Sequence, residues 1–357
     1  MSRLQQIAKL RQELIDDKPD LAAQVTAIRE NAISNLPDLI ATATETLQRK
    51  LANVYFAKDE AELAGILKTI LKGESRVSRA HSNTLAEIDF DGIMTNLGVE
   101  VSLTNMEEIV RQQMKLPDHG HPRLLVLDQP RHVIEEGLRR YTGHPEKIAP
   151  NELGRLVTEQ VKQNILHSGC GVTGADCIVA ENGVLALAED DGNARAVSSL
   201  PYKHLAIVGL EEIVASVEEA VTVIQAASIV GAGRLTPTYI SLIAGPSRTA
   251  DIEFRMAYGM HGPKEVHVIL LDNGRKALHQ GAASSLLKCI NCGSCYESCV
   301  ELAARQQWTD VTMTPKDFAL GLLQGRLSPL KSKAPMREFS CPVGLTAEDV
   351  PESLARI

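Results

Sequence analysis

Five of the seven cysteines in this 357-residue chain lie between residue 289 and the C-terminal end. Four of them form the segment CINCGSCYESC, whose spacing is C-x2-C-x2-C-x3-C. Three thiolates on so short a loop can bind one small inorganic group, and Gly293 allows the backbone to approach it closely. The spacing is typical of a [4Fe–4S] cluster. The alternatives are a zinc site, although zinc-binding cysteine pairs usually lie farther apart in sequence, and four core cysteines spaced by chance.

The fourth ligand is open to two readings. In two-cluster ferredoxins the cysteine after x3 binds the other cluster, and a remote Cys-Pro completes the first. Here Cys299 precedes Val300, whereas Cys341 precedes Pro342. Five cysteines cannot hold two cubanes, so we expect one cluster. The favoured ligands are Cys289, Cys292, Cys295 and Cys341, with Cys299 as the alternative fourth.

Two acidic residues belong to an expected hairpin in the middle of the chain, one before its first strand and one at its turn. Asp176 precedes the strand-like run CIVA, and Glu181 precedes Asn182-Gly183 and the run VLAL. Asn-Gly is a strong signal for a hairpin turn. Asp176 is either a pocket residue or a turn residue, and Glu181 is a candidate catalytic carboxylate at the tip of a sheet.

The segment GPSRTAD, residues 245–251, follows another strand-like run, SLIA. Ser247 and Arg248 combine a hydroxyl with a guanidinium, which suits a small anionic ligand, and Asp251 lies beside them. The competing interpretation is a helix start capped by Ser247 or Thr249. His204, at the start of a further strand, is a third kind of candidate, although a lone histidine is more often structural.

The surrounding pattern predicts an α/β protein in three parts. Residues 1–72 have helical periodicity with one strand-like run at 51–57, and residues 73–277 alternate short apolar runs with helix-length stretches, as expected for a largely parallel sheet. Residues 278–357 read as short helices around the cysteines and a turn-rich tail. The expected helices of the middle part span residues 151–166 and 211–225. Its expected strands span residues 123–127, 177–180, 184–187, 204–208, 241–244 and 266–271.

Composition and the absence of certain motifs argue against several classes of protein. The net charge of −8 and the 3% aromatic content argue against nucleic-acid binding. The N-terminal segment has no apolar signal-peptide core, and no run approaches the ~20 apolar residues of a membrane span, so we expect a soluble, cytoplasmic protein. The sequence contains no dinucleotide fingerprint after a strand, no phosphate-binding P-loop and no serine-hydrolase elbow.

The ordered segments TGADCIVAENGVLAL, SSLPYKHLAIVGLEEIV, SLIAGPSRTADIEF and HGPKEVHVILLDNGR, followed by CINCGSC and Cys341-Pro342, resemble the LutB-like lactate-utilization (LUD-domain) iron–sulfur proteins. The resemblance implies a LUD domain similar in fold to ribose-phosphate isomerases and CoA transferases, with a ferredoxin-like tail. It implies an electron-transfer subunit of a complex that oxidises L-lactate to pyruvate, with a redox partner or dehydrogenase subunits, whereas the cysteine count limits this chain to one [4Fe–4S] cluster. A small anionic metabolite would then bind to the six candidates Asp176, Glu181, His204, Ser247, Arg248 and Asp251.

This chain departs from that family in carrying one cysteine set and a single late Cys-Pro instead of two full sets. Two other functions therefore stay open. The segment around Glu181 also resembles the glutamate-bearing element of CoA transferases, so an acyl-transfer or ligand-sensing domain with a structural or regulatory cluster is one alternative. A non-enzymatic scaffold that docks a cluster onto a dehydrogenase is the other.

Overall fold

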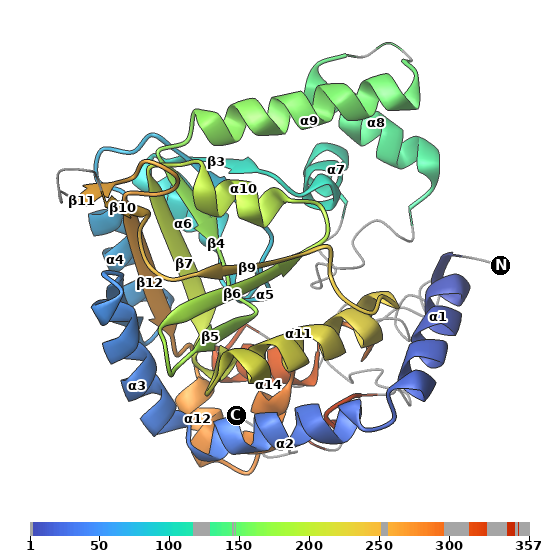
Figure 1. Ribbon diagram of the computed structural model, residues 1–357. Coiled ribbons are helices and arrows are strands. Elements are labelled where there is room, and N and C mark those ends of the chain that lie inside the picture. The colour runs from blue at the N-terminus through green and yellow to red at the C-terminus, as the bar shows by residue number, and fades with distance from the viewer. Residues whose placement is uncertain are drawn as a thin grey trace.

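The computed structural model describes residues 3–116, 129–144, 146, 148–250, 256–295, 314–326, 341–346 and 349. Two β-sheets form its centre, with helices on both outer sides (Figure 1). The larger sheet has six strands, all paired in parallel. Their spatial order is β1 (Asn53–Ala57), β12 (Glu265–Leu271), β7 (Lys203–Gly209), β4 (Cys170–Thr173), β2 (Arg76–Arg79) and β3 (Glu100–Leu103). The expected parallel α/β architecture is confirmed.

The smaller sheet has mixed pairing and lies against one face of the larger. Its order is β8 (Ile213–Val214), β5 (Cys177–Val179), β6 (Val184–Glu189) and β9 (Tyr239–Ile243). Strands β5 and β6 pair antiparallel around Asn182-Gly183, which confirms the predicted hairpin. Gly183 has a φ of 66°, and its N–H donates to the Val179 carbonyl at 3.0 Å. Residues 180–183 form the four-residue connection, and glycine adopts the positive φ needed there more readily than other residues.

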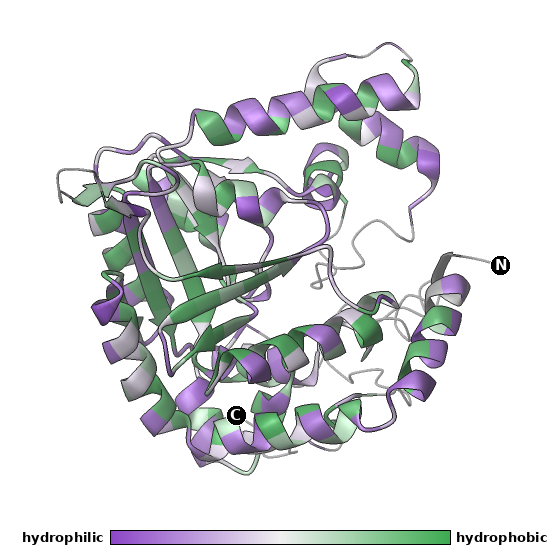
Figure 2. Ribbon diagram, in the orientation of Figure 1, coloured by the Kyte–Doolittle hydropathy of each residue, from purple (hydrophilic) through white to green (hydrophobic). Residues whose placement is uncertain are grey.

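The alternation of side chains along β7 explains how the layers are held together. Leu205 and Ile207 point to a core shared with α4 (Glu60–Ile70) and α6 (Phe90–Leu97). Ala206 and Val208 point the other way, into a core shared with the smaller sheet and α3 (Leu36–Arg49). A strand buried on both faces reads as a continuous apolar run, as the HLAIVG segment does. Figure 2 shows this apolar character along the strands of both sheets.

The remaining helices cover the edges and the outer face of the smaller sheet. Helices α7, α8, α9 and α10 share one core beside β3, and α2 and α11 pack over the outer face of β5 and β6. Their bounds are α1 (Arg3–Asp17), α2 (Leu21–Ser34), α5 (Asn83–Ala86), α7 (Met106–Met114), α8 (Arg131–Thr142), α9 (Pro150–Leu166), α10 (Asn193–Ser199), η2 (Leu210–Glu212), α11 (Val217–Ala232), α12 (Arg275–Gln280), η3 (Ser284–Lys288) and α14 (Pro315–Leu323). None of the helices in the described part of the chain is long and apolar enough to cross a bilayer.

Two sequence predictions in the middle of the chain are wrong in detail. The segment after β9 does not begin a helix, because β10 (Arg248–Ala250) pairs antiparallel with β11 (Met256–Tyr258). The Ser247 hydroxyl accepts a hydrogen bond from the His261 N–H instead of capping a helix. The helix expected at 211–225 begins only at Val217, where the Ser216 hydroxyl caps it.

Other differences concern short strands. Strands β2, β3 and β4 have four residues each, which is too short to show periodicity in the sequence. The strand expected at 123–127 lies outside the described residues. Strand β1, in the first 72 residues, is an edge strand of the large sheet, because Asn53 to Ala57 pair with His267 to Leu271.

Candidate metal centre

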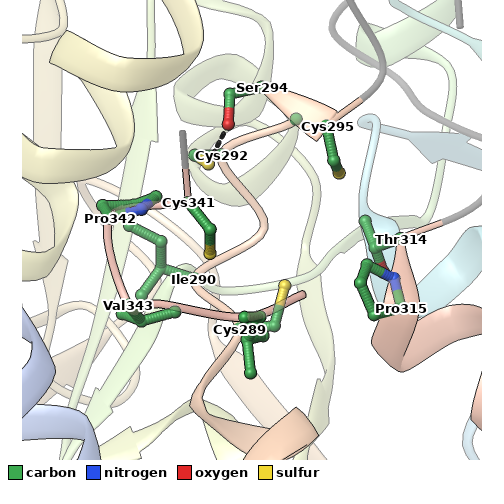
Figure 3. Close-up of a pocket in the computed structure, with 12 residues that line it drawn as sticks. Cys289, Ile290, Cys292, Ser294, Cys295, Thr314, Pro315, Cys341, Pro342 and Val343 are labelled. Carbon is green, nitrogen blue, oxygen red and sulfur yellow. Dashed lines mark hydrogen bonds between the residues drawn. The ribbon is translucent and has the colours of Figure 1, made fainter. Parts of the chain in front are cut away.

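Four cysteines from two distant segments line one hollow (Figure 3). Cys289, Cys292 and Cys295 come from the loop after η3, and Cys341 comes from residues 341–346. Their sulfur atoms face the hollow from different sides. The rest of the lining is largely apolar: Ile290, Gly293, Ser294, Thr314, Pro315, Pro342, Val343 and Leu345.

The cysteine loop is anchored to the body of the protein just before the first ligand candidate. Leu286 and Leu287 are fully buried in the core that α2 and α11 form. Arg29 of α2 donates to the Leu287 carbonyl at 2.7 Å and to the Lys288 carbonyl at 3.3 Å. The cysteines therefore start from a rigid position, as a metal site requires.

Two left-handed residues then turn the loop back on itself. Asn291 has a φ of 53° and Gly293 has a φ of 80°. Asparagine and glycine adopt this conformation more readily than other residues. The turn brings Cys289 and Cys292 to the same hollow.

The second segment docks on the same helix as the first. The Thr26 hydroxyl of α2 donates to the Pro342 carbonyl at 3.2 Å. Val343 and Leu345 are buried in the core that also contains Leu286 and Leu287. Helix α2 thus positions Cys341 opposite the C-x2-C-x2-C loop, and the sequence prediction that these four cysteines meet is consistent with their shared hollow.

Three thiols of this site, those of Cys289, Cys295 and Cys341, lie in an environment that keeps them protonated. Burial raises the pKa of Cys289 to about 12, and burial also raises the pKa of Cys295 and Cys341. A metal must therefore displace these protons when it binds. The Asn291 N–H donates to the Cys289 sulfur at 3.5 Å, and the Cys292 thiol donates to the Ser294 hydroxyl at 3.6 Å.

The donor set fits an iron–sulfur cluster in type and number, because such clusters take four cysteine thiolates. The fit rests on the type and number of the ligands, because no group of three or more His, Cys, Asp or Glu side chains within the described ranges is arranged to hold a single metal ion. Cys299 lies outside the described residues.

A buried array of charges lies at the carboxyl ends of β7 and β12, beside the cysteine segment. Lys316 of α14 is fully buried, and its Nζ lies 2.7 Å from the Glu211 Oε1. The Arg275 guanidinium, also fully buried, binds both Glu211 and Glu87. Although burial opposes ionisation, the two cations hold the pKa of Glu211 below its usual range. Sequence analysis missed this array, because its members are widely separated in the chain.

The candidate residues around the β5–β6 hairpin have structural partners. The Asp176 carboxylate accepts a hydrogen bond from the Ala188 N–H at 2.7 Å. Glu181 is exposed, and its carboxylate accepts from the Val217 N–H at 3.3 Å, at the start of α11. Asp176 precedes β5 and Glu181 follows it, so the two carboxylates lie at opposite ends of this strand.

The remaining candidates lie on other elements. His204 is fully buried in β7, and its Nε2 lies 2.8 Å from the Thr173 hydroxyl. Burial, and secondarily His267, lowers the pKa of His204 to about 4, so the ring is neutral at pH 7. Ser247 lies beside the start of β12, since its N–H donates to the Pro263 carbonyl. Arg248 is exposed, and Asp251 lies outside the described residues.

A family model described as the LUD domain matches residues 40–271. The chain belongs to the LUD domain family. The match begins within α3 and ends at the last residue of β12, so it covers both sheets but not the cysteine segment. The resemblance inferred from the ordered motifs is therefore confirmed for the α/β part.

Curated relatives of this LUD domain protein are named for lactate utilization or for electron transport. It is 28% identical over 260 residues to "Lactate utilization protein B" of Shouchella clausii and 27% identical over 264 residues to the protein of that name from Bacillus subtilis. It is 28% identical over 260 residues to "Uncharacterized electron transport protein YkgF" of Escherichia coli. Each alignment covers 71% of this chain and 52% of the relative, so the chain spans about half the length of these proteins.

A solved structure, a DUF162 family protein from Deinococcus radiodurans, aligns with a TM-score of 0.36 and 16% identity. The alignment covers 66% of this chain and 98% of that protein.

Proposed function

We propose that this LUD domain protein is an electron-transfer component of a lactate (2-hydroxyacid) oxidation system. In this proposal Cys289, Cys292, Cys295 and Cys341 hold one [4Fe–4S] cluster. The observation that carries the proposal is the hollow itself, in which four cysteines from two segments face a common space. The relatives named for lactate utilization and for electron transport support the assignment to this system.

When bound, such a cluster accepts and releases one electron at a time. The chain's own residues would prepare the site for this role. Ile290, Val343 and Leu345 give the hollow apolar walls, and the dielectric and solvent access around a cluster help to set its reduction potential. The nearby Lys316 ammonium favours the thiolate form of Cys289.

The first experiment measures iron and acid-labile sulfide on anaerobically purified protein, together with the EPR spectrum after dithionite reduction. About four of each per chain and a spectrum of a reduced cubane are expected. Zinc in place of iron, or no metal at all, would refute the proposal.

Single substitutions then identify the ligands. Cys292→Ser and Cys341→Ser should lose most of the iron, whereas Cys299→Ser should keep it. Cys170→Ser is the matched control, because Cys170 is buried in the large sheet, away from the hollow. If Cys299→Ser loses the iron and Cys341→Ser keeps it, the alternative fourth ligand is correct.

The lactate assignment needs its own test. The loaded protein should gain an electron from L-lactate only when the dehydrogenase subunits of an L-lactate-oxidising complex are present. Reduction is followed by EPR, with a mixture lacking lactate as the control. A cluster that loads normally but is never reduced in this mixture would leave the metal centre intact and refute its role in lactate oxidation.

A further inference from the structure

One carboxyl of the buried charge array forms no ion pair within the described part of the chain and faces the cysteine loop. Glu212 ends the 3₁₀ helix η2 and is 7% exposed. Its Oε2 accepts hydrogen bonds from the Gly209 N–H at 2.8 Å and from the Thr84 hydroxyl at 3.1 Å. Its Oε1 lies 3.3 Å from the Asn291 Nδ2. All three of these partners are uncharged.

The charge balance of the array favours a proton on this carboxyl. Three buried glutamates, Glu87, Glu211 and Glu212, share two buried cations, Arg275 and Lys316. Both cations contact Glu211 and Glu87, and Lys316 also lies 3.9 Å from the partly buried Asp317. Carboxylates therefore outnumber cations in the array, and an uncompensated charge is costly at a buried position.

Burial also raises the pKa of Glu87, but Glu87 and Glu211 both form ion pairs with the buried cations, whereas Glu212 forms none within the described residues. Burial, together with the adjacent negative charge of Glu211, raises the pKa of Glu212 to about 8. The groups that surround it come from several elements. They are Glu211 of η2, Arg275 of α12, Lys316 of α14, Thr84 of α5, and Asn291 of the cysteine loop.

Asn291 connects this carboxyl to the cysteine site. It lies between Cys289 and Cys292 in the sequence, and its N–H donates to the Cys289 sulfur at 3.5 Å. Its side-chain Oδ1 lies 3.7 Å from the same sulfur. Its side-chain nitrogen points to Glu212. Asn291 therefore contacts both the ligand candidate Cys289 and the Glu212 carboxyl.

We propose that Glu212 is a proton-accepting site coupled through Asn291 to the redox state of the cysteine-bound group. This inference rests on the proposed function. Reduction adds one electron to the metal centre, and one proton from solvent converts the Glu212 carboxylate to the carboxylic acid. No bond to the metal centre forms or breaks. The added negative charge makes the protonated form of Glu212 more favourable, so electron and proton uptake assist one another.

The linkage has a defined sign. Below the pKa of Glu212 in the oxidised protein, the carboxyl is protonated in both redox states, and the reduction potential does not change with pH. Above that pKa, reduction takes up a proton, and the potential falls as pH rises. The slope can reach about 59 mV per pH unit, the value for one proton and one electron.

The test is a redox titration of the iron-loaded protein between pH 6 and 10, followed by EPR with dithionite as reductant. The native protein should show a constant potential at low pH and a falling potential above about pH 8. Glu212→Gln, which keeps the side-chain shape, should remove the fall. Glu218→Gln is the control, because Glu218 is exposed on α11 and should leave the native curve unchanged.

Reduced-minus-oxidised infrared spectra give a second readout. A carboxylic-acid C=O band should appear on reduction at pH 9 and be absent in Glu212→Gln. Asn291→Ala should retain the band but weaken the pH dependence. A flat native curve, or a Glu212→Gln curve identical to the native one, would overturn the proposal. Protein without iron would instead refute the proposed function, and its metal analysis separates the two outcomes.

Discussion

The buried ion pair between Lys316 and Glu211 offers a sharp test of how the cysteine segment is joined to the LUD domain. Lys316 belongs to α14, and Glu211 follows β7. Both side chains are fully buried, and the Nζ–Oε1 distance is 2.7 Å. Lys316→Met keeps most of the side-chain volume but removes the cation. Glu211 is then left with Arg275, which Glu87 also needs.

Breaking a buried pair from one side typically costs about 3–5 kcal/mol, because the other charge stays buried without its partner. Since Arg275 still binds Glu211, we expect Lys316→Met to lower the free energy of unfolding by about 3 kcal/mol. The double variant Lys316→Met/Glu211→Gln should lose clearly less than the sum of the single variants, because it removes both charges of the pair.

The assay is chemical denaturation followed by circular dichroism, with iron content measured on each preparation. Lys9→Met is the matched control, since Lys9 forms only an exposed pair with Glu13 and should be close to neutral. Two results would contradict this reasoning: a Lys316→Met protein as stable as Lys9→Met, or a double variant whose loss equals the sum of the Lys316→Met and Glu211→Gln losses. In either case the Lys316–Glu211 ion pair would not stabilise the contact between α14 and the residues after β7.

Two other predictions concern the sheets. Gly183→Ala should lower the free energy of unfolding by at least ~2 kcal/mol, because Gly183 has a φ of +66° and a Cβ there would lie 2.5 Å from the Thr46 backbone. Gly65→Ala is the control and should not lower it, because a Cβ at Gly65 would have no atom within 4 Å. Equal effects of the two substitutions in denaturation experiments would contradict this prediction. Because the pKa of His204 is lowered to about 4 in the folded protein, the unfolded chain binds a proton there at pH values where the folded chain does not. The free energy of unfolding should therefore fall by at most about 3 kcal/mol as the pH drops from about 6.5 to 4. His204→Gln should remove this part of the pH dependence, and unfolding curves of the two proteins from pH 4 to 8 would show whether it does.

Much of the LUD domain was predictable because its strands carry strong local signals. The runs at 177–180, 184–187, 204–208 and 266–271 are apolar and bounded by turn residues, and each is a strand. The hairpin was predictable for the same reason, since Asn-Gly is a strong hairpin signal and Gly183 takes the positive φ in the connection. The four-residue strands β2, β3 and β4 have no such signal, and only pairing with their neighbours defines them.

The segment after β9 shows where local signals mislead. Ser247 and Thr249 are suitable helix caps, yet residues 248–250 pair with residues 256–258. Hydrogen bonds from Gly259 and His261 to Ser247 stabilise this hairpin, and they come from residues more than ten positions away. The preference of a residue for a helix cap is a local property, whereas strand pairing depends on which other segment lies beside that residue in the folded chain.

The sequence by itself determined which thiols are available to the cysteine site. The number and spacing of the cysteines and the late Cys341-Pro342 follow from residue types alone. Only the tertiary structure brought Cys341 to the hollow, because α2 binds both cysteine segments through contacts that no local pattern encodes. The buried array around Glu212 is the clearest case, since charges far apart in the chain acquire their protonation states only when folding removes water from all of them together.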